Sequence, residues 1–107
     1  MKRILLDHCV PKPLRRWVPN EMVRTCHEEG WDAFRNGELL AAAESAGFEV
    51  FVTADKNLRY QQNLASRRLA IIELPTNRLA KLPFLVPALL SAIALAAPGS
   101  YQEIPMP

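Results

Sequence analysis

The chain is 107 residues long, with 50% hydrophobic and 22% charged residues and a formal net charge of +2 at pH 7. This length predicts one domain over residues 1–107 and excludes a barrel of eight strand–helix units, which needs about 250 residues. The hydrophobic content excludes a disordered chain, and the small net charge argues against a strongly basic protein that wraps nucleic acid. A nuclease remains compatible with this small net charge, because the charges of an acidic site and a basic rim can cancel in the total.

The cysteines and apolar runs indicate where the protein resides. Cys9 and Cys26 form no CxxC pair, so we expect neither a disulfide framework nor a zinc ribbon, and a reducing cytoplasm fits. The apolar run at residues 4–6 is shorter than the core of a signal peptide, which takes ~7–15 residues. The uncharged stretch at residues 82–97 holds two prolines and is shorter than the ~18–20 residues that span a bilayer. We therefore expect a cytoplasmic protein with no membrane segment.

Strand and helix patterns alternate in the first third of the chain. Pro11 and Pro13 suit the first turn of a helix, where a missing N–H costs nothing. Thr25 and Glu28 have the spacing of a capping box, which predicts the start of a helical turn. The expected elements are a strand at 4–6, a helix from Pro11, a strand at 22–25 and a helical turn that Gly30 closes.

The alternation continues to the end of the chain. Asn36 is a favourable N-cap, Gly47 is a favourable left-handed stop, and Asp55 is a favourable cap for a short helix. The expected elements are a helix at 36–46, a strand at 48–53, a short helix after Asp55, a strand at 70–74, a helix at 87–97 and an edge strand at 101–104.

This order predicts an α/β fold. Strands joined by helices imply right-handed crossovers and a parallel sheet covered on both faces. We expect a three-layer α/β/α sandwich with a mainly parallel sheet of four to five strands, in which the first four strands have the order 2-1-3-4. Ligands of such sheets bind beyond the carboxyl ends of the strands, which is where functional residues are expected.

Three carboxylates are expected near that edge. Asp7 ends the first strand, Asp55 lies two residues beyond the third, and Glu38 lies in the first turn of the helix from Asn36. If the first and third strands are neighbours, Asp7 and Asp55 project into one crevice, and the turn with Glu38 can face it. Clustered carboxylates repel one another unless one retains a proton or a cation binds. Oxygen ligands suit Mg²⁺ or Mn²⁺, and such an ion supports phosphodiester hydrolysis.

Three segments carry a resemblance to a known family: ILLD at residues 4–7, NGELL at 36–40 and FVTADKNLRYQQNL at 51–64. They resemble the PIN-like domains, in particular the small single-domain bacterial members of unknown function, over residues 1–77. That class includes the VapC-type toxin ribonucleases, whose acids hold Mg²⁺ or Mn²⁺. The resemblance implies a ribonuclease acting on RNA, with an antitoxin protein as a partner. It assigns catalysis and metal binding to Asp7, Glu38 and Asp55, and supporting positions beside them to Thr53, Asn57 and His8.

Other functions are weighed against this one. Asn57 and His8 stand where many relatives have acids, which favours a second hypothesis, a catalytically weak binding module. A phospho-receiver domain is disfavoured, because His8 and Cys9 do not supply its paired acids and residues 101–104 contain no lysine. Zinc held by His8, Cys9, Cys26 and His27 is also disfavoured, since the spacing is not that of a zinc finger.

Two surfaces are expected to bind partners. Basic residues flank the predicted crevice and could bind phosphates, the alternative being an ordinary solvated surface. The candidates are Lys12, Arg15, Arg35, Lys56 and Arg59. The helix at 87–97 has no charged face, unlike an ordinary surface helix, which predicts a homodimer or a partner chain bound through it.

Overall fold

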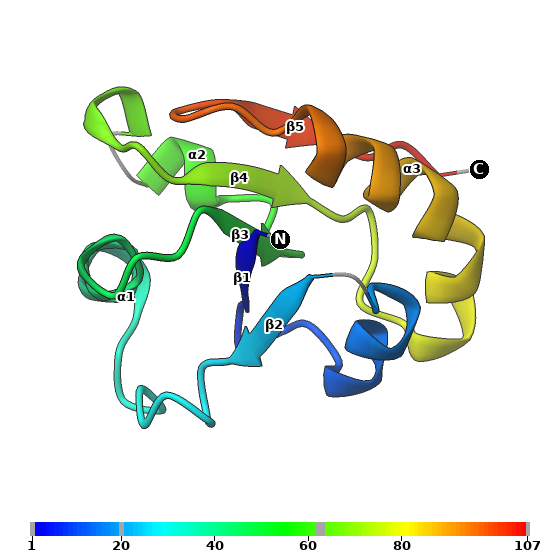
Figure 1. The fold of residues 1–107 in the computed structure, drawn as a ribbon, viewed down its shortest axis with the longest axis horizontal. Coiled ribbons are helices and arrows are strands. Elements are labelled where there is room, and N and C mark those ends of the chain that lie inside the picture. Colours follow the sequence, from blue (N-terminus) through cyan, green and yellow to red (C-terminus); the bar gives the residue numbers. More distant parts are fainter. Residues whose placement is uncertain (1, 20, 62–63, 107) are drawn as a thin grey trace.

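Five parallel strands form one sheet in the order β2-β1-β3-β4-β5, with helices on both of its faces (Figure 1). The structure, a computed structural model, describes residues 2–19, 21–61 and 64–106. The strands are β1 (Arg3–Leu6), β2 (Met22–Thr25), β3 (Val50–Thr53), β4 (Ala70–Glu73) and β5 (Tyr101–Glu103). The α-helices are α1 (Asn36–Ser45), α2 (Leu58–Gln61) and α3 (Leu82–Leu95). Short 3₁₀ helices are η1 (Lys12–Trp17), η2 (Leu64–Ser66) and η3 (Leu79–Lys81).

The predicted α/β class, the parallel sheet and its strand order are confirmed. The edge strand at the end of the chain is also present, as β5 paired parallel to β4. The chain buries both faces of the sheet because the side chains of a strand alternate between them. On one face Ile4 and Leu6 belong to a core with η1 and α3, and on the other Leu5 and Phe51 belong to a core with α1.

Several predicted elements differ in type or bounds. The segment with Pro11 and Pro13 forms the 3₁₀ helix η1 instead of an α-helix. The last helix begins at Leu82, five residues before the predicted start, because Pro83 instead of Pro87 occupies its first turn. Arg35 is the N-cap of α1, and Asn36 is its first helical residue. Gly47 ends that helix at a φ of +85°, as predicted.

The predicted capping box forms, and it anchors the loop that leads from β2 to α1. The Thr25 N–H donates to Glu28 Oε1 (2.9 Å), and the Glu28 N–H donates to Thr25 Oγ1 (3.2 Å). Residues 26–30 remain turns and do not become a helix. The same carboxylate accepts two hydrogen bonds from Arg15, at 2.8 and 2.9 Å. The Thr25 N–H and Arg15 lower the pKa of Glu28 to about 2. This network stabilises the start of the loop that carries Cys26.

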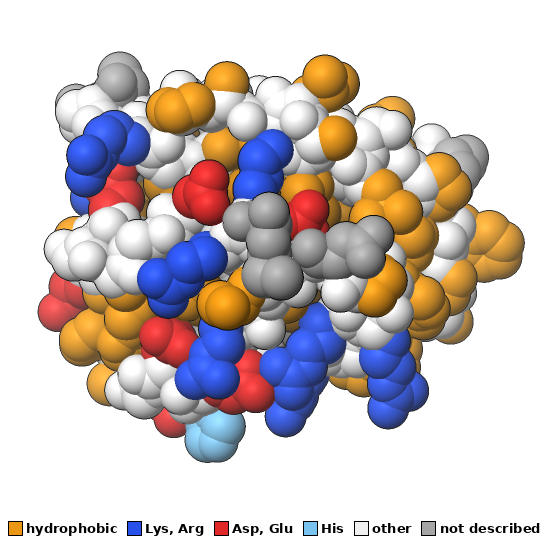
Figure 2. Space-filling view, viewed as in Figure 1, with side chains coloured by type: hydrophobic (Ala, Val, Ile, Leu, Met, Phe, Trp, Pro, Cys, Tyr) orange, Lys and Arg blue, Asp and Glu red, His pale blue; other side chains and the backbone are white. Residues whose placement is uncertain are grey.

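The helix α3 has an apolar outer face. Its inner side buries Leu82, Leu85, Leu89, Ala92 and Ile93, while Phe84 is 68% exposed and Leu95 is 76% exposed. The helix contains no charged residue, and Figure 2 shows hydrophobic side chains gathered on the side of the molecule where it lies. Among the described helices, none has both the length and the apolar character that a membrane crossing requires.

We propose that a second copy of the chain covers this outer face, because an uncharged surface meets its own copy without like-charge repulsion. Sedimentation of the wild type should then show a dimer at micromolar concentration. The double change Phe84→Glu and Leu95→Glu should weaken association at least about tenfold, since burial of one such side chain contributes ~1.5–3 kcal/mol. The change Met22→Glu, at an exposed apolar residue of β2, is the control. A wild type that stays monomeric at high micromolar concentration would contradict the proposal.

Candidate functional site

Asp7 and Asp55 line one cavity at the carboxyl edge of the sheet. Asp7 directly follows β1, and Asp55 lies two residues beyond β3, the strand that pairs with β1. The cavity has a volume of about 250 Å³, and His8, Cys9 and Arg35 also line it. It lies at the point where the strand order reverses. The chain runs from β1 to β2 on one side of β1, and then returns to β3 on the other side. This is the usual place for a ligand in an open parallel sheet.

The hydroxyl of Thr53 connects the two carboxylate residues. It donates to Asp7 Oδ2 at 2.7 Å and accepts from the Asp55 N–H at 3.0 Å. The Asp7 Oδ1 atom accepts from the His8 N–H at 2.7 Å. Thr53 is the last residue of β3 and is fully buried, so these contacts have little freedom to move. The carboxylate of Asp7 is therefore held in a fixed orientation.

Asp55 also shapes the turn that leads into α2. Its Oδ1 atom accepts from the Asn57 N–H at 2.9 Å, and its backbone carbonyl accepts from the Leu58 N–H at 3.3 Å. In this described contact, Asn57 binds the Asp55 carboxylate through its backbone N–H, and the side chain of Asn57 is exposed. The turn holds Asp55 at the mouth of the cavity.

Among the described residues, Glu38 is not one of those that line this cavity. It lies in the first turn of α1 and is exposed, while the next two residues, Leu39 and Leu40, are buried and line the cavity. Among the described side chains, Asp7, Glu38 and Asp55 do not gather their oxygens within 4.8 Å of one another. The buried leucines decide how α1 is rotated, and that rotation leaves Glu38 at the surface.

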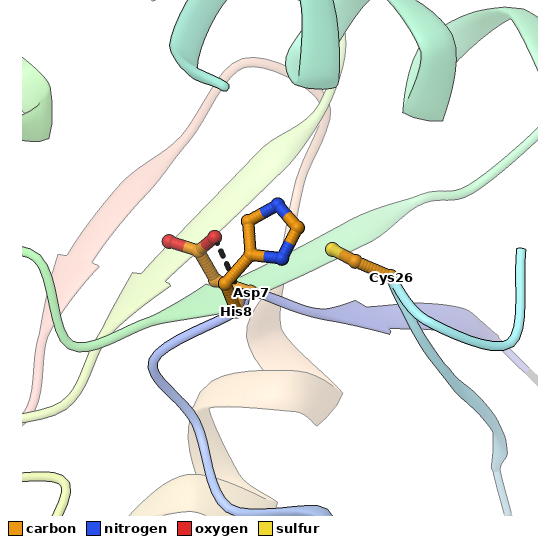
Figure 3. A group of neighbouring side chains, drawn as sticks. All are labelled: Asp7, His8 and Cys26. Carbon is orange, nitrogen blue, oxygen red and sulfur yellow. Dashed lines mark hydrogen bonds between the residues drawn. The ribbon is translucent and has the colours of Figure 1, made fainter. Parts of the chain in front are cut away.

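A different group of potential ligands does gather beside β1. One ligand atom from each of Asp7, His8 and Cys26 lies within 4.8 Å of the other two (Figure 3). The strand register explains this proximity, because Leu6 is paired with Thr25, so the residues that follow them are Asp7 and Cys26. The Cys26 thiol donates to the Leu6 carbonyl at 3.2 Å.

The two thiols are not activated nucleophiles. Burial, followed by the charge of Asp7, raises the pKa of Cys26 to about 12. Burial also raises the pKa of Cys9. Both thiols are therefore protonated at neutral pH, whereas a catalytic cysteine needs a lowered pKa. The raised pKa values of the two thiols do not favour cysteine-based catalysis.

The predicted basic residues are spread around this edge. Arg35 lines the cavity, and its Nη1 atom donates to the Phe34 carbonyl at 2.8 Å. Arg15 is paired with Glu28, and Lys12 lies 4.0 Å from the same carboxylate. Lys56 and Arg59 line a neighbouring hollow, where Arg59 pairs with Glu103. On the face that Figure 2 draws, blue and red side chains are interspersed.

One buried acid was missed by the sequence analysis. Glu73, at the end of β4, is 7% exposed and accepts from the Tyr101 hydroxyl at 2.5 Å. Burial and this carboxylate raise the pKa of Tyr101. The apolar pattern around Glu73 indicated only a buried strand, so nothing in the sequence marked the acid as paired.

The cavity thus combines carboxylate oxygens, an imidazole and a guanidinium around an apolar floor of Leu39, Leu40, Phe51 and Leu58. Such a set can hold a cation and contact an anionic ligand. Comparison of the chain with models of known protein families, with curated proteins and with solved structures gave no match.

The role of Thr53 is tested by removing its hydroxyl at constant shape. Thr53→Val leaves the Asp7 Oδ2 atom and the Asp55 N–H without this partner, so we expect the free energy of unfolding to fall by about 1–3 kcal/mol. Thr53→Ser keeps the hydroxyl and should retain most of that stability. Urea denaturation of the three proteins measures the difference. If the valine variant and the wild type have the same free energy of unfolding, the hydrogen bonds of the Thr53 hydroxyl to Asp7 and Asp55 do not stabilise the fold.

Proposed function

We propose that the chain is a metal-dependent ribonuclease with a PIN-like fold, whose Mg²⁺ or Mn²⁺ ion is held by Asp7, Asp55 and Glu38. The observation that carries the proposal is the shared cavity of Asp7 and Asp55 at the reversal point of the sheet. The resemblance of three sequence segments to PIN-like domains supports the same residues. RNA as the substrate and an antitoxin protein as a partner are proposed from that resemblance.

The donor set fits a hard divalent cation. An ionised carboxylate offers about four lone-pair positions. The described hydrogen bonds use three of these at Asp7 and one at Asp55, so both residues keep the capacity to ligate. Glu38 is exposed and directly precedes Leu39, which lines the cavity, so its side chain would have to turn inward to complete the set. Oxygen ligands of this kind suit Mg²⁺ and Mn²⁺.

The residues around the carboxylates suit a phosphodiester substrate. A bound divalent ion would supply a Lewis acid for a phosphoryl oxygen. Arg35, on the cavity wall, can donate hydrogen bonds to the phosphate, and a guanidinium does so in a bidentate manner. The apolar floor lowers the local dielectric beside the carboxylates, which strengthens these charge interactions. Lys56, which lines the neighbouring hollow, can contact the next phosphate along the strand.

The proposal predicts that either central carboxylate is required for cleavage. Asp7→Asn and Asp55→Asn should each lower Mn²⁺-dependent cleavage of a labelled single-stranded RNA by at least about 100-fold, because the amide cannot replace a charged ligand or accept a proton. Glu49→Gln is the matched control, since Glu49 is an exposed carboxylate that precedes β3, at the opposite edge of the sheet. Cleavage by Asp7→Asn at the rate of the wild type would contradict the proposal.

The second hypothesis, a catalytically weak binding module, is favoured by the exposed position of Glu38. It differs from the nuclease in its response to metal. Calorimetry should show Mn²⁺ binding at submillimolar concentration if the chain is a nuclease, with loss of that binding in Asp55→Asn. RNA binding without Mn²⁺ binding at millimolar concentration would favour the module and contradict the nuclease.

A further inference from the structure

We propose that Asp7, His8 and Cys26 form a site for Zn²⁺ or a similar transition metal, distinct in chemistry from the oxygen-ligated site proposed above. The three side chains offer one oxygen, one nitrogen and one sulfur ligand. Imidazole and thiolate are preferred ligands of Zn²⁺ and are poor ligands for Mg²⁺. Three protein ligands with a fourth position left for water is the composition of catalytic and exchangeable zinc sites.

The separation of the three ligand atoms is close to that of a zinc site. Zn–N and Zn–O distances of ~2.0 Å and a Zn–S distance of ~2.3 Å place the ligand atoms of a tetrahedral ion about 3.3–3.5 Å apart. The ligand atoms of Asp7, His8 and Cys26 lie within 4.8 Å of one another. Each separation therefore exceeds that of a tetrahedral ion by at most about 1.5 Å.

The imidazole of His8 is oriented as a ligand should be. Its Nε2 atom lies 2.8 Å from the Phe34 carbonyl oxygen and 3.3 Å from Arg35 Nη1, and in the tautomer that donates to the carbonyl Nε2 carries the proton. That leaves the lone pair on Nδ1, and Figure 3 shows the ring nitrogen nearer the backbone facing the sulfur of Cys26. A hydrogen bond from the other ring nitrogen to a backbone carbonyl is the usual support for a metal-binding histidine.

Asp7 and Cys26 are held by the sheet. Both follow paired residues of β1 and β2, and the carboxylate of Asp7 is oriented by the hydroxyl of Thr53 and the N–H of His8. Residues on rigid strand ends form more precise sites than residues on free loops. Metal binding would release the thiol proton of Cys26 to solvent and replace its hydrogen bond to the Leu6 carbonyl.

The surroundings allow an ion to enter and balance its charge. The cavity of about 250 Å³ gives solvent a path to Asp7 and His8, which line it, whereas Cys26 is buried and lies outside its lining. Arg35 places one positive charge nearby, with Nη1 at 3.3 Å from His8 Nε2. The Asp7 carboxylate and the Cys26 thiolate together supply two negative charges toward the ion.

The chain contains a matched control for each soft ligand. Cys9 and His27 are its other cysteine and histidine, and neither belongs to the group of close ligand atoms. His27 instead contacts the Asp32 carboxylate at 3.0 Å, and Cys9 contacts Thr53 and Asp7. The variant His27→Ala therefore leaves all three proposed ligands untouched, and Cys9→Ser removes the other thiol while keeping a hydroxyl donor beside Asp7.

The test is titration of the reduced protein with Co²⁺, followed by displacement with Zn²⁺. We expect one equivalent of Co²⁺ to give a thiolate-to-cobalt absorption band and visible bands of a tetrahedral ion. His8→Ala and Cys26→Ser should weaken binding roughly 100-fold, because each removes one of three ligands. Cys9→Ser and His27→Ala should retain the bands. This readout is binding alone, so it is separate from the test of RNA cleavage.

Circular dichroism shows whether each variant is folded, and the exposed position of His8 makes His8→Ala informative even if Cys26→Ser unfolds. The proposal is overturned if the wild type binds neither ion at millimolar concentration. It is equally overturned if a folded His8→Ala binds Co²⁺ like the wild type, or if Cys9→Ser and not Cys26→Ser loses the thiolate band.

Discussion

The parallel pairing of β1 with β3 is the constraint on which the rest of the site depends. It brings the residues that follow the two strands, Asp7 and Asp55, to one edge of the sheet, where the buried hydroxyl of Thr53 contacts both of them. The pairing persists because both faces of these strands are buried, in one core with α3 and another with α1. Apolar packing thus brings two acids to one cavity, where both could ligate a bound cation.

The sheet order and the shared position of Asp7 and Asp55 could be predicted from the sequence, because both follow from strands alternating with helices. The rotation of α1 could not, since it depends on how Leu39 and Leu40 pack, and Glu38 is exposed as a result. The start of α3 was misplaced because Pro83 and Pro87 both suit a first turn. The proximity of Cys26 to Asp7 depends on the register in which β1 pairs with β2. A sequence pattern does not specify that register.

Asp7 belongs to both proposed sets of ligands, and this gives the cavity two chemical characters. Toward Asp55 it offers oxygen donors that suit Mg²⁺ or Mn²⁺, and toward His8 and Cys26 it offers the softer donors that suit Zn²⁺. The small net charge of the chain is consistent with a local separation, with acids inside the cavity and Arg35 on its wall. Other basic residues are engaged elsewhere, as Arg15 is with Glu28.

The central claim is that the carboxylates of Asp7 and Asp55 hold a divalent cation at the carboxyl edge of the sheet. The most direct measurement is anomalous diffraction from a crystal of the protein soaked in Mn²⁺. The account predicts a manganese peak within bonding distance of the Asp7 carboxylate, on the side that faces Asp55. A fully occupied peak elsewhere on the molecule, or no peak in the cavity at millimolar Mn²⁺, would contradict it.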